Sequence, residues 1–199
     1  MTELILASRS ASRRAMLAAA GVSFRVEAAA VDEESVKAAL RADGIGSRNL
    51  ADALAELKAM KLGRRYPTAL VLGCDSTVET EDGQPIDKAE SREEAADQLR
   101  RLAGTTHRLT SAVVAVEQGA PVWRHVETAK LTMRRFSDGF LDAYLDAEWP
   151  AIAGCVGNYR LEAMGAQLFS RIEGSHFAIL GLPLLPLLDW LRTRGILAA

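Results

Sequence analysis

The sequence predicts a mixed α/β fold, in which short apolar strands alternate with helices. Residues 4–8 form an apolar run that leads directly into an alanine-rich helix over 12–20. Residues 69–73 form a second apolar run, which is short enough to be a buried central strand. Residues 108–117 and 122–134 are rich in β-forming side chains and are joined by a short loop, so we expect a hairpin there. Helices and a sheet must therefore share one core.

The first half of the chain divides at glycines and polar stretches. The helix over 12–20 ends at Gly21, and an extended segment over 22–28 leads into the acidic residues 31–34. A polar break over 42–47 precedes a helix over 49–63. That helix turns four leucines toward the core, namely Leu50, Leu54, Leu57 and Leu62.

The second half shows clear capping and turn signals. Ser91 followed by Glu94 is a capping box, which opens a helix that closes at Gly104. Residues 81–83 form a turn, and 118–121 form the hairpin loop. The remaining predicted elements are a helix over 137–147, a glycine-rich connection through Gly157, a strand near 167–172 and a C-terminal helix opened by Pro183.

Length and composition restrict the class of protein. The 199 residues suffice for one domain, or for two small lobes that share a sheet. The formal net charge of −2 argues against stable nucleic-acid binding, and no apolar run is long enough for a membrane span. Cys74 and Cys155 both lie in apolar stretches, which suits buried thiols in a reducing compartment. We therefore expect a cytoplasmic protein.

The turn after the first strand has the character of a phosphate cradle. Ser8, Ser10 and Ser12 offer hydroxyl groups, and Arg13 and Arg14 stand in the first turn of a helix, where the macrodipole disfavours cations. A bound anion would resolve that conflict, because helix N-termini and guanidinium groups both bind phosphate. A solvated helix end is the alternative for this segment taken alone.

A second group of charged residues follows the apolar strand over 69–73. Asp75 stands just past the predicted carboxyl end of that strand, where α/β proteins bind ligands and where a carboxylate can hold a divalent ion or accept a proton. Lys58 flanks the apolar face of its helix, and Lys88 follows the turn over 81–83. Together with Glu33, these residues are typical of polyphosphate chemistry. Taken singly, Asp75 could merely start a turn, and one lysine in either place is usually a surface residue.

Several segments then resemble, in order, the motifs of one family. They are Leu6-Ala7-Ser8-Arg9-Ser10-Ala11-Ser12-Arg13, Lys58-Ala59, Gly73-Cys74-Asp75-Ser76, Lys88, Leu102-Ala103-Gly104-Thr105-Thr106-His107, and the closing segment from Phe169 to Pro183. Each motif is weak alone. Their order and spacing resemble the Maf family of nucleotide pyrophosphatases over nearly the whole chain.

The resemblance implies one domain over residues 1–199, with two lobes around a central cleft and a long mixed sheet flanked by helices, as in inosine triphosphate pyrophosphatases. It implies cleavage of a nucleoside triphosphate to the monophosphate and pyrophosphate with a divalent cation, Mg²⁺ or Mn²⁺. Asp75 would be the proton acceptor or a metal ligand, and Glu33 a second metal or water-positioning carboxylate. The substrate would be held by Ser8, Ser10, Arg13, Lys58 and Lys88.

Three positions are expected to read the base, namely Ser12, Ser76 and Glu162. Relatives that resemble thymidine and uridine triphosphate pyrophosphatases carry Arg, Thr and Gln there, and those that resemble 7-methylguanosine triphosphate pyrophosphatases carry Trp, Gln and Glu. This chain fits neither set. An ionised Glu162 only accepts hydrogen bonds, which favours a base edge with donors, such as that of guanine. We therefore expect loose selection with a preference for purines.

The chain also departs from the family motifs elsewhere. The usual prolines are replaced by Ala11 and Ala89, a glycine is replaced by Asp87, and an asparagine is replaced by Ala178. The family's usual Asp-Lys-Ala-Gly motif has no lysine here, because residues 151–157 take its place. His107 occupies a motif position, where a structural role at the start of a strand is expected.

Two other functions and one assembly are compatible with these residues. A non-catalytic nucleotide-binding regulator of cell division could use the same cleft, although it would not need Asp75 together with its cationic partners. An inosine-triphosphate-type enzyme would carry Asn and Lys after its first strand instead of serines and arginines. A homodimer is left open.

Overall fold

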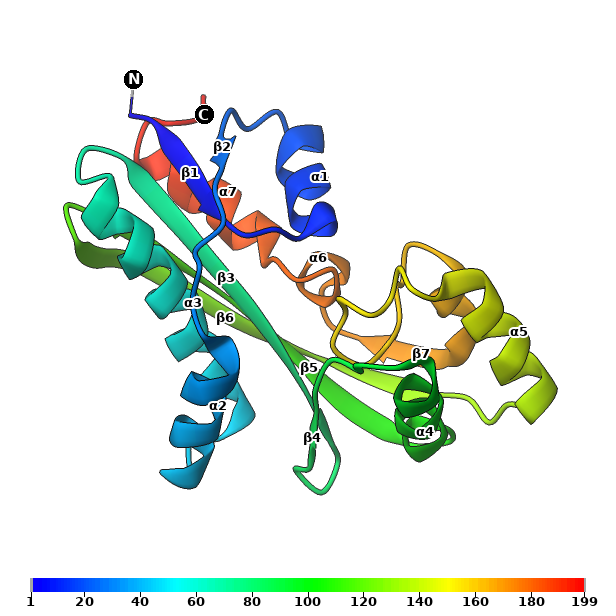
Figure 1. Cartoon of the computed structure of the whole chain (residues 1–199). Helices are drawn as coiled ribbons and strands as arrows, with labels where there is room; N and C mark the ends of the chain where they lie inside the picture. The colour runs from blue at the N-terminus through cyan, green and yellow to red at the C-terminus, as the bar shows by residue number, and fades with distance from the viewer. Residues whose placement is uncertain (1, 199) are drawn as a thin grey trace. The chain divides into compact units, whose positions relative to one another are not determined.

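The computed structural model describes residues 2–198, so the two end residues of the predicted domain over 1–199 lie outside the described residues. The helices and strands alternate along the chain as predicted (Figure 1). In order they are β1 (Leu4–Ala7), α1 (Ala11–Ala19), β2 (Arg25–Val26), α2 (Glu33–Ala42), α3 (Ser47–Arg65), β3 (Leu70–Thr80), β4 (Pro85–Ile86), α4 (Arg92–Leu102), β5 (Thr106–Glu117), β6 (Ala120–Met133), α5 (Asp138–Glu148), the 3₁₀ helix η1 (Met164–Leu168), β7 (Phe169–Glu173), α6 (His176–Ile179) and α7 (Leu184–Thr193).

The described strands form one seven-stranded mixed sheet, which confirms the predicted fold class. Its order is β2-β1-β3-β5-β6-β7, with β4 paired to β3 off this path. The β1 strand pairs in parallel with both β2 and β3, whereas β6 and β7 pair antiparallel. The predicted hairpin is β5 and β6, joined by Gln118 and Gly119, which both have positive φ. Such a two-residue turn suits the twist of paired strands.

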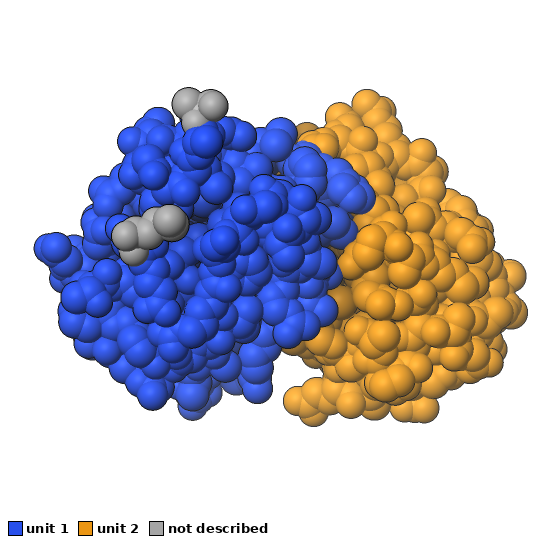
Figure 2. Space-filling model, turned by 90° about the horizontal axis from the view of Figure 1, so that it is seen from above, with its two compact units in different colours: residues 1–76, 110–127, 175–199 blue, residues 77–109, 128–174 orange. Residues whose placement is uncertain are grey.

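The chain divides into two compact units (Figure 2). Unit 1 comprises residues 1–76, 110–127 and 175–199, and unit 2 comprises residues 77–109 and 128–174. Strands β3, β5 and β6 each contribute residues to both units.

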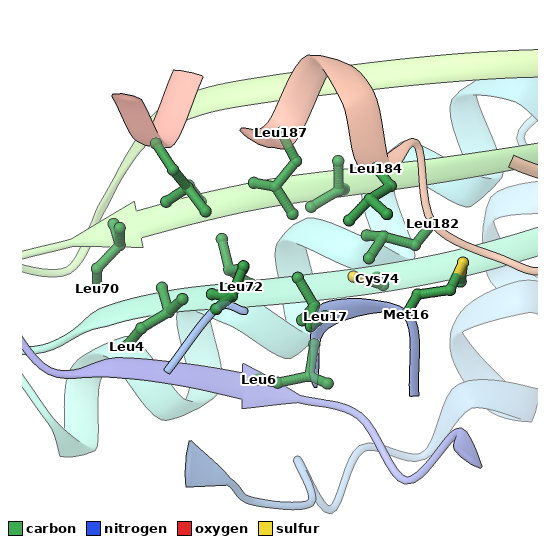
Figure 3. Close-up of a cluster of buried hydrophobic side chains, with 14 residues drawn as sticks. Leu4, Leu6, Met16, Leu17, Leu70, Leu72, Cys74, Leu182, Leu184 and Leu187 are labelled. Carbon is green, nitrogen blue, oxygen red and sulfur yellow. The ribbon is translucent and has the colours of Figure 1, made fainter. Parts of the chain in front are cut away.

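Unit 1 packs a helix layer on each face of its strands. Alternate side chains of a strand point to opposite faces, so β1 and β3 supply both layers. On one face, Leu6 and Leu72 pack with α1 and α7, and Figure 3 shows leucines of β1, β3 and α7 in this cluster. On the other face, Ile5 and Val71 pack with Ala51, Ala55 and Ala59 of α3. These small alanines let α3 lie close to the sheet.

Unit 2 buries polar side chains among its apolar ones. His107 Nε2 lies 2.9 Å from the Tyr159 hydroxyl, and Phe169 packs against both rings. Glu148 accepts from Nε and Nη2 of Arg160, at 2.9 and 2.7 Å. His107 is fully buried in β5, which agrees with the structural role expected for it.

Three local predictions need correction. The strand predicted over 69–73 continues to Thr80, because Thr77, Val78 and Thr80 keep favouring extended backbone. The acidic stretch opens helix α2, which was not predicted: Asp32 caps it, and Glu33 lies in its first turn, where carboxylates are favoured.

Leu57 is only half-buried, whereas Leu50, Leu54 and Leu62 are buried as predicted. The capping box is confirmed at Ser91, which accepts from the Glu94 N–H. No helix among residues 2–198 has the length and apolar character needed to cross a membrane.

Candidate active site

The first part of the candidate site is the turn between the carboxyl end of β1 and helix α1. The last residue of β1, Ala7, pairs with Gly73 of β3, and the chain then turns into α1. Ser10 caps that helix, because its hydroxyl accepts from the Arg13 N–H at 3.4 Å. Ser10 N–H in turn donates to Ser8 Oγ at 3.2 Å. The predicted strand-to-helix turn is therefore present, and the hydroxyl groups of Ser8 and Ser10 accept hydrogen bonds from its backbone N–H groups.

Arg13 holds four oxygens of unit 1 with its guanidinium group. Its Nε donates to the Gly181 carbonyl at 2.7 Å, and its Nη1 donates to Ser8 Oγ and to the Cys74 carbonyl, both at 3.2 Å. Its Nη2 donates to Ser76 Oγ at 2.9 Å. All four partners are uncharged, so the positive charge of Arg13 is not neutralised by any of them. Arg14 is exposed.

Ser8 is left with a hydroxyl hydrogen to offer. Its oxygen accepts from Ser10 N–H and from Arg13 Nη1, which occupies both lone pairs. The side chain is nearly buried at the end of β1. Its O–H therefore suits an acceptor from outside the protein, such as a phosphate oxygen.

Gly73 brings a second group of residues together on the other face of β3. A Cβ at this position would lie 2.0 Å from the Ala55 carbonyl oxygen and 2.7 Å from the Ala59 nitrogen, so only glycine fits beneath α3. This close approach puts Lys58 of α3 beside Asp75 of β3, with 2.6 Å between Nζ and Oδ1.

Lys58 bridges two carboxylates. Its Nζ also lies 3.0 Å from Glu33 Oε1 at the start of α2. The side chains of Lys58 and Asp75 are only 9% and 8% exposed, whereas that of Glu33 is 26% exposed. Asp75 Oδ2 is buried and has no hydrogen-bond partner in the described residues. A buried carboxylate oxygen without a donor is costly, which indicates that a cation or water completes it.

The position of Asp75 differs from the prediction in one respect. Asp75 lies within β3, not past its end, because the strand continues to Thr80. The strand that ends here is β1, at Ala7 opposite Gly73. Alternation along β3 then directs Asp75 toward Lys58 on one face and Ser76 toward Arg13 on the other.

Two predicted site residues belong to unit 2, and one more lies on α1. Lys88 is exposed between β4 and α4, and Glu162 is exposed before η1. Both act electrostatically on the half-buried Cys155 thiol, whose pKa is raised chiefly by burial. Ser12 is half-buried in the first turn of α1, and its predicted role in reading the base stays a prediction.

Sequence reasoning missed Ser111, Gly181 and the backbone of Ala178. Ser111 Oγ contacts Ser76 Oγ at 2.8 Å and donates to the Ala178 carbonyl at 2.7 Å. Gly181 has φ +101°, which favours glycine, and a Cβ there would lie 3.1 Å from Arg13 Nε. The family resemblance had singled out the closing segment from Phe169 to Pro183, which contains Ala178 and Gly181, but it gave no sign of the contacts that their carbonyl groups make.

Cys74, the sequence neighbour of Asp75, is not a nucleophile candidate. Burial raises the pKa of the Cys74 thiol to about 11, so the thiol stays neutral near pH 7. Its carbonyl, not its sulfur, takes part in the site through Arg13.

These features define a class: an α/β protein with a cationic strand-to-helix turn and a lysine-bridged pair of carboxylates, a set suited to a polyphosphate ligand. Comparison with known proteins gives the family. Residues 3–194 match the family model described as Maf-like protein. This chain belongs to the Maf family.

Curated relatives match over almost their full lengths. A protein of Sphingopyxis alaskensis named nucleoside triphosphate pyrophosphatase is 52% identical over 97% of this chain and 98% of its own. Proteins with the same name from Paramagnetospirillum magneticum and Caulobacter vibrioides are 51% and 49% identical, over 96% and 99% of this chain and 98% of their own chains. The predicted family resemblance is confirmed.

Proposed function

We propose that this protein is a nucleoside triphosphate pyrophosphatase. Water adds to the α phosphorus, the bond from that phosphorus to the bridging oxygen breaks, and the products are a nucleoside monophosphate and pyrophosphate. The relatives that match over nearly their whole length bear this name. The observation that carries the proposal is the Lys58 bridge between Asp75 and Glu33, beside which Asp75 Oδ2 is buried with no hydrogen-bond partner among residues 2–198.

Each part of unit 1 has a role in this reaction. The Ser8 hydroxyl donates to a phosphate oxygen, and the charge of Arg13 stabilises the negative triphosphate. Asp75 Oδ2 either accepts the proton of the attacking water or acts as a ligand to a metal ion. Lys58 holds Asp75 in place through the 2.6 Å contact with Oδ1, which leaves Oδ2 available for either task.

The residues fit a divalent ion such as Mg²⁺ or Mn²⁺. Asp75 Oδ2 and the Glu33 carboxylate would hold it, and the bound ion supplies positive charge to the phosphates. Among residues 2–198 no group of three or more His, Cys, Asp and Glu side chains could hold a metal. Two carboxylates nevertheless suit Mg²⁺, because it takes its other ligands from substrate phosphates and water.

A product analysis tests the reaction. The purified chain is incubated with common and modified nucleoside triphosphates in Mg²⁺ or Mn²⁺, and pyrophosphate and orthophosphate are measured separately. We expect one pyrophosphate for each monophosphate formed. A diphosphate with orthophosphate contradicts attack at the α phosphorus, and tight binding without turnover favours the non-catalytic regulator.

We also propose that Glu162 reads the base and that Lys88 contacts the triphosphate. An amide presents a donor as well as an acceptor, so Glu162→Gln should change the ranking of bases, with relative kcat/KM shifting by about 5- to 150-fold. Equal losses on every base would assign Glu162 to phosphate or metal binding. Lys88→Ala should instead lower kcat/KM for all bases alike.

Free thiols at Cys74 and Cys155 support a reducing compartment, and we propose the cytoplasm. The homodimer stays a prediction, and sedimentation velocity would test it.

A further inference from the structure

Ser111 is a buried polar residue that the proposed reaction does not use. It lies in β5 and is 0% exposed. Its oxygen lies 2.8 Å from Ser76 Oγ and 2.7 Å from the Ala178 carbonyl oxygen. Ser76 Oγ also accepts from Arg13 Nη2. These contacts form one chain of hydrogen bonds within unit 1.

The chain has only one consistent direction. The Ala178 carbonyl can only accept, so the single hydroxyl hydrogen of Ser111 must go to it. Ser111 Oγ must then accept from Ser76, whose own hydrogen is thereby used. Ser76 Oγ in turn accepts from Arg13, which only donates. The order is Arg13 to Ser76 to Ser111 to the Ala178 carbonyl.

This direction gives the two serines beside Arg13 opposite properties. Ser8 accepts twice and keeps its hydrogen for an outside acceptor. Ser76 has given its hydrogen to Ser111 and keeps a lone pair for Arg13. Without the Ser111 hydroxyl, the Ser76 hydrogen would lose the acceptor that it has here, and Ser76 could rotate away from Arg13 Nη2.

We propose that Ser111 is a positioning residue, whose hydroxyl fixes Ser76 as an acceptor and thereby fixes the orientation of the Arg13 guanidinium group. Given the proposed function, the effect on catalysis is indirect, because Ser111 acts on the substrate only through Ser76 and Arg13. The Arg13 Nε bond to Gly181 holds one side of the guanidinium plane, and the Ser76 bond holds the other.

A double-mutant cycle tests whether Ser111 acts through Ser76. Ser111→Ala should raise KM about 5- to 10-fold for every nucleotide, with kcat changed less than about 2-fold, as expected for the loss of one buried hydrogen bond. In a Ser76→Ala background the same change should alter KM less than about 2-fold, because the link is already broken. Additive effects on KM in the double variant would overturn the proposal. Ser111→Thr, which keeps the hydroxyl, should restore most of the loss.

A matched control removes another hydroxyl of β5, one that is paired with a hydroxyl of β6. Thr106 Oγ1 lies 3.0 Å from Thr132 Oγ1, outside the candidate site. Thr106→Val should leave KM within about 2-fold of the wild type. Urea unfolding of all variants separates a change in KM from a general loss of stability.

A spectroscopic measurement tests this chain of hydrogen bonds independently of the proposed function. The ¹⁵N–¹H signal of Arg13 Nε is assigned by its loss in Arg13→Lys, and its hydrogen exchange is then followed. Ser111→Ala should speed this exchange at least about 5-fold, and Thr106→Val should not. Unchanged exchange in Ser111→Ala would overturn the proposal, even where wild-type pyrophosphate release is normal. Absence of pyrophosphate release with faster exchange would instead contradict only the proposed function.

Discussion

At the scale of single residues, a substitution of Asp75 gives the sharpest test of the proposed reaction. Asp75 Oδ1 binds Lys58 Nζ at 2.6 Å, and its Oδ2 is buried with no hydrogen-bond partner among the described residues. Asp75→Asn keeps the shape but removes charge and basicity. We expect kcat to fall about 10²- to 10⁴-fold, the scale of a lost general base, with the fold retained by circular dichroism. Mn²⁺ binding, measured in parallel, separates the two roles, because only a metal ligand also lowers affinity for the ion.

Asp52 offers a matched control for this change. It is another carboxylate of unit 1. Its Oδ2 accepts from Arg124 Nη1 at 2.6 Å, and its Oδ1 is buried with no partner in the described part of the chain. Asp52→Asn should leave kcat within about 2-fold of the wild type. An equal loss in both variants would mean that Asp75 acts through stability and not through chemistry.

Arg13 should be irreplaceable by lysine. Its guanidinium group donates to four oxygens at once, which a single ammonium cannot do. Arg13→Lys keeps the charge, and we expect it to lower kcat/KM nearly as much as Arg13→Ala, by about 10²-fold or more and equally on all bases. Near-normal kinetics in Arg13→Lys would mean that charge alone matters at this position.

At the scale of elements, the approach of α3 to β3 assembles the carboxylate cluster. Gly73→Ala would force a Cβ to 2.0 Å from the Ala55 carbonyl, so the helix must move away. We expect a loss of about 1–3 kcal/mol in the free energy of unfolding, together with a fall in kcat as Lys58 separates from Asp75. Gly139→Ala is the control, because a Cβ there meets nothing within 4 Å. It should be neutral or slightly stabilising.

The packing of β5 in unit 2 makes stability depend on pH. Burial lowers the pKa of His107 to about 4, from an ordinary value of 6.5. Between those values the unfolded chain binds a proton that the folded chain does not, so stability falls as pH decreases from 6.5 toward 4. The loss reaches about 3 kcal/mol once pH is below 4, at about 1.4 kcal/mol per unit.

Urea unfolding at several pH values between 7 and 4 measures this loss. In His107→Gln the decrease should be smaller by about that amount, since the amide does not titrate. Parallel curves for the two proteins would show that other groups cause the acid sensitivity.

The same elements show what sequence can and cannot predict. Period-two and helical patterns gave most helices and the hairpin, because each depends on near neighbours in the chain. The length of β3 and the start of α2 were missed, although β-branched residues and the Asp32 cap were present. In both cases the charged residues were interpreted for their chemistry, and the stretch of strand or helix to which they belong was not predicted.

At the scale of the whole molecule, the site residues themselves were predictable but their partners were not. Ser8, Arg13, Lys58 and Asp75 stand in recognisable motifs, and their contacts lie within unit 1. The acceptors on Gly181 and Ala178 could not be foreseen, because carbonyl groups carry no sequence signal. Pairings over such separations are set by tertiary packing.

The bond from Arg13 to Gly181 joins residues 168 positions apart, so the order of synthesis separates the two partners. The helix that carries Arg13 is made long before the carbonyl that orients its guanidinium group. A nascent chain therefore carries every residue of unit 2 before Arg13 has its Gly181 acceptor. A chain shortened before residue 175 would lack both this acceptor and α7, which covers one face of the unit 1 strands, and should lose stability together with activity.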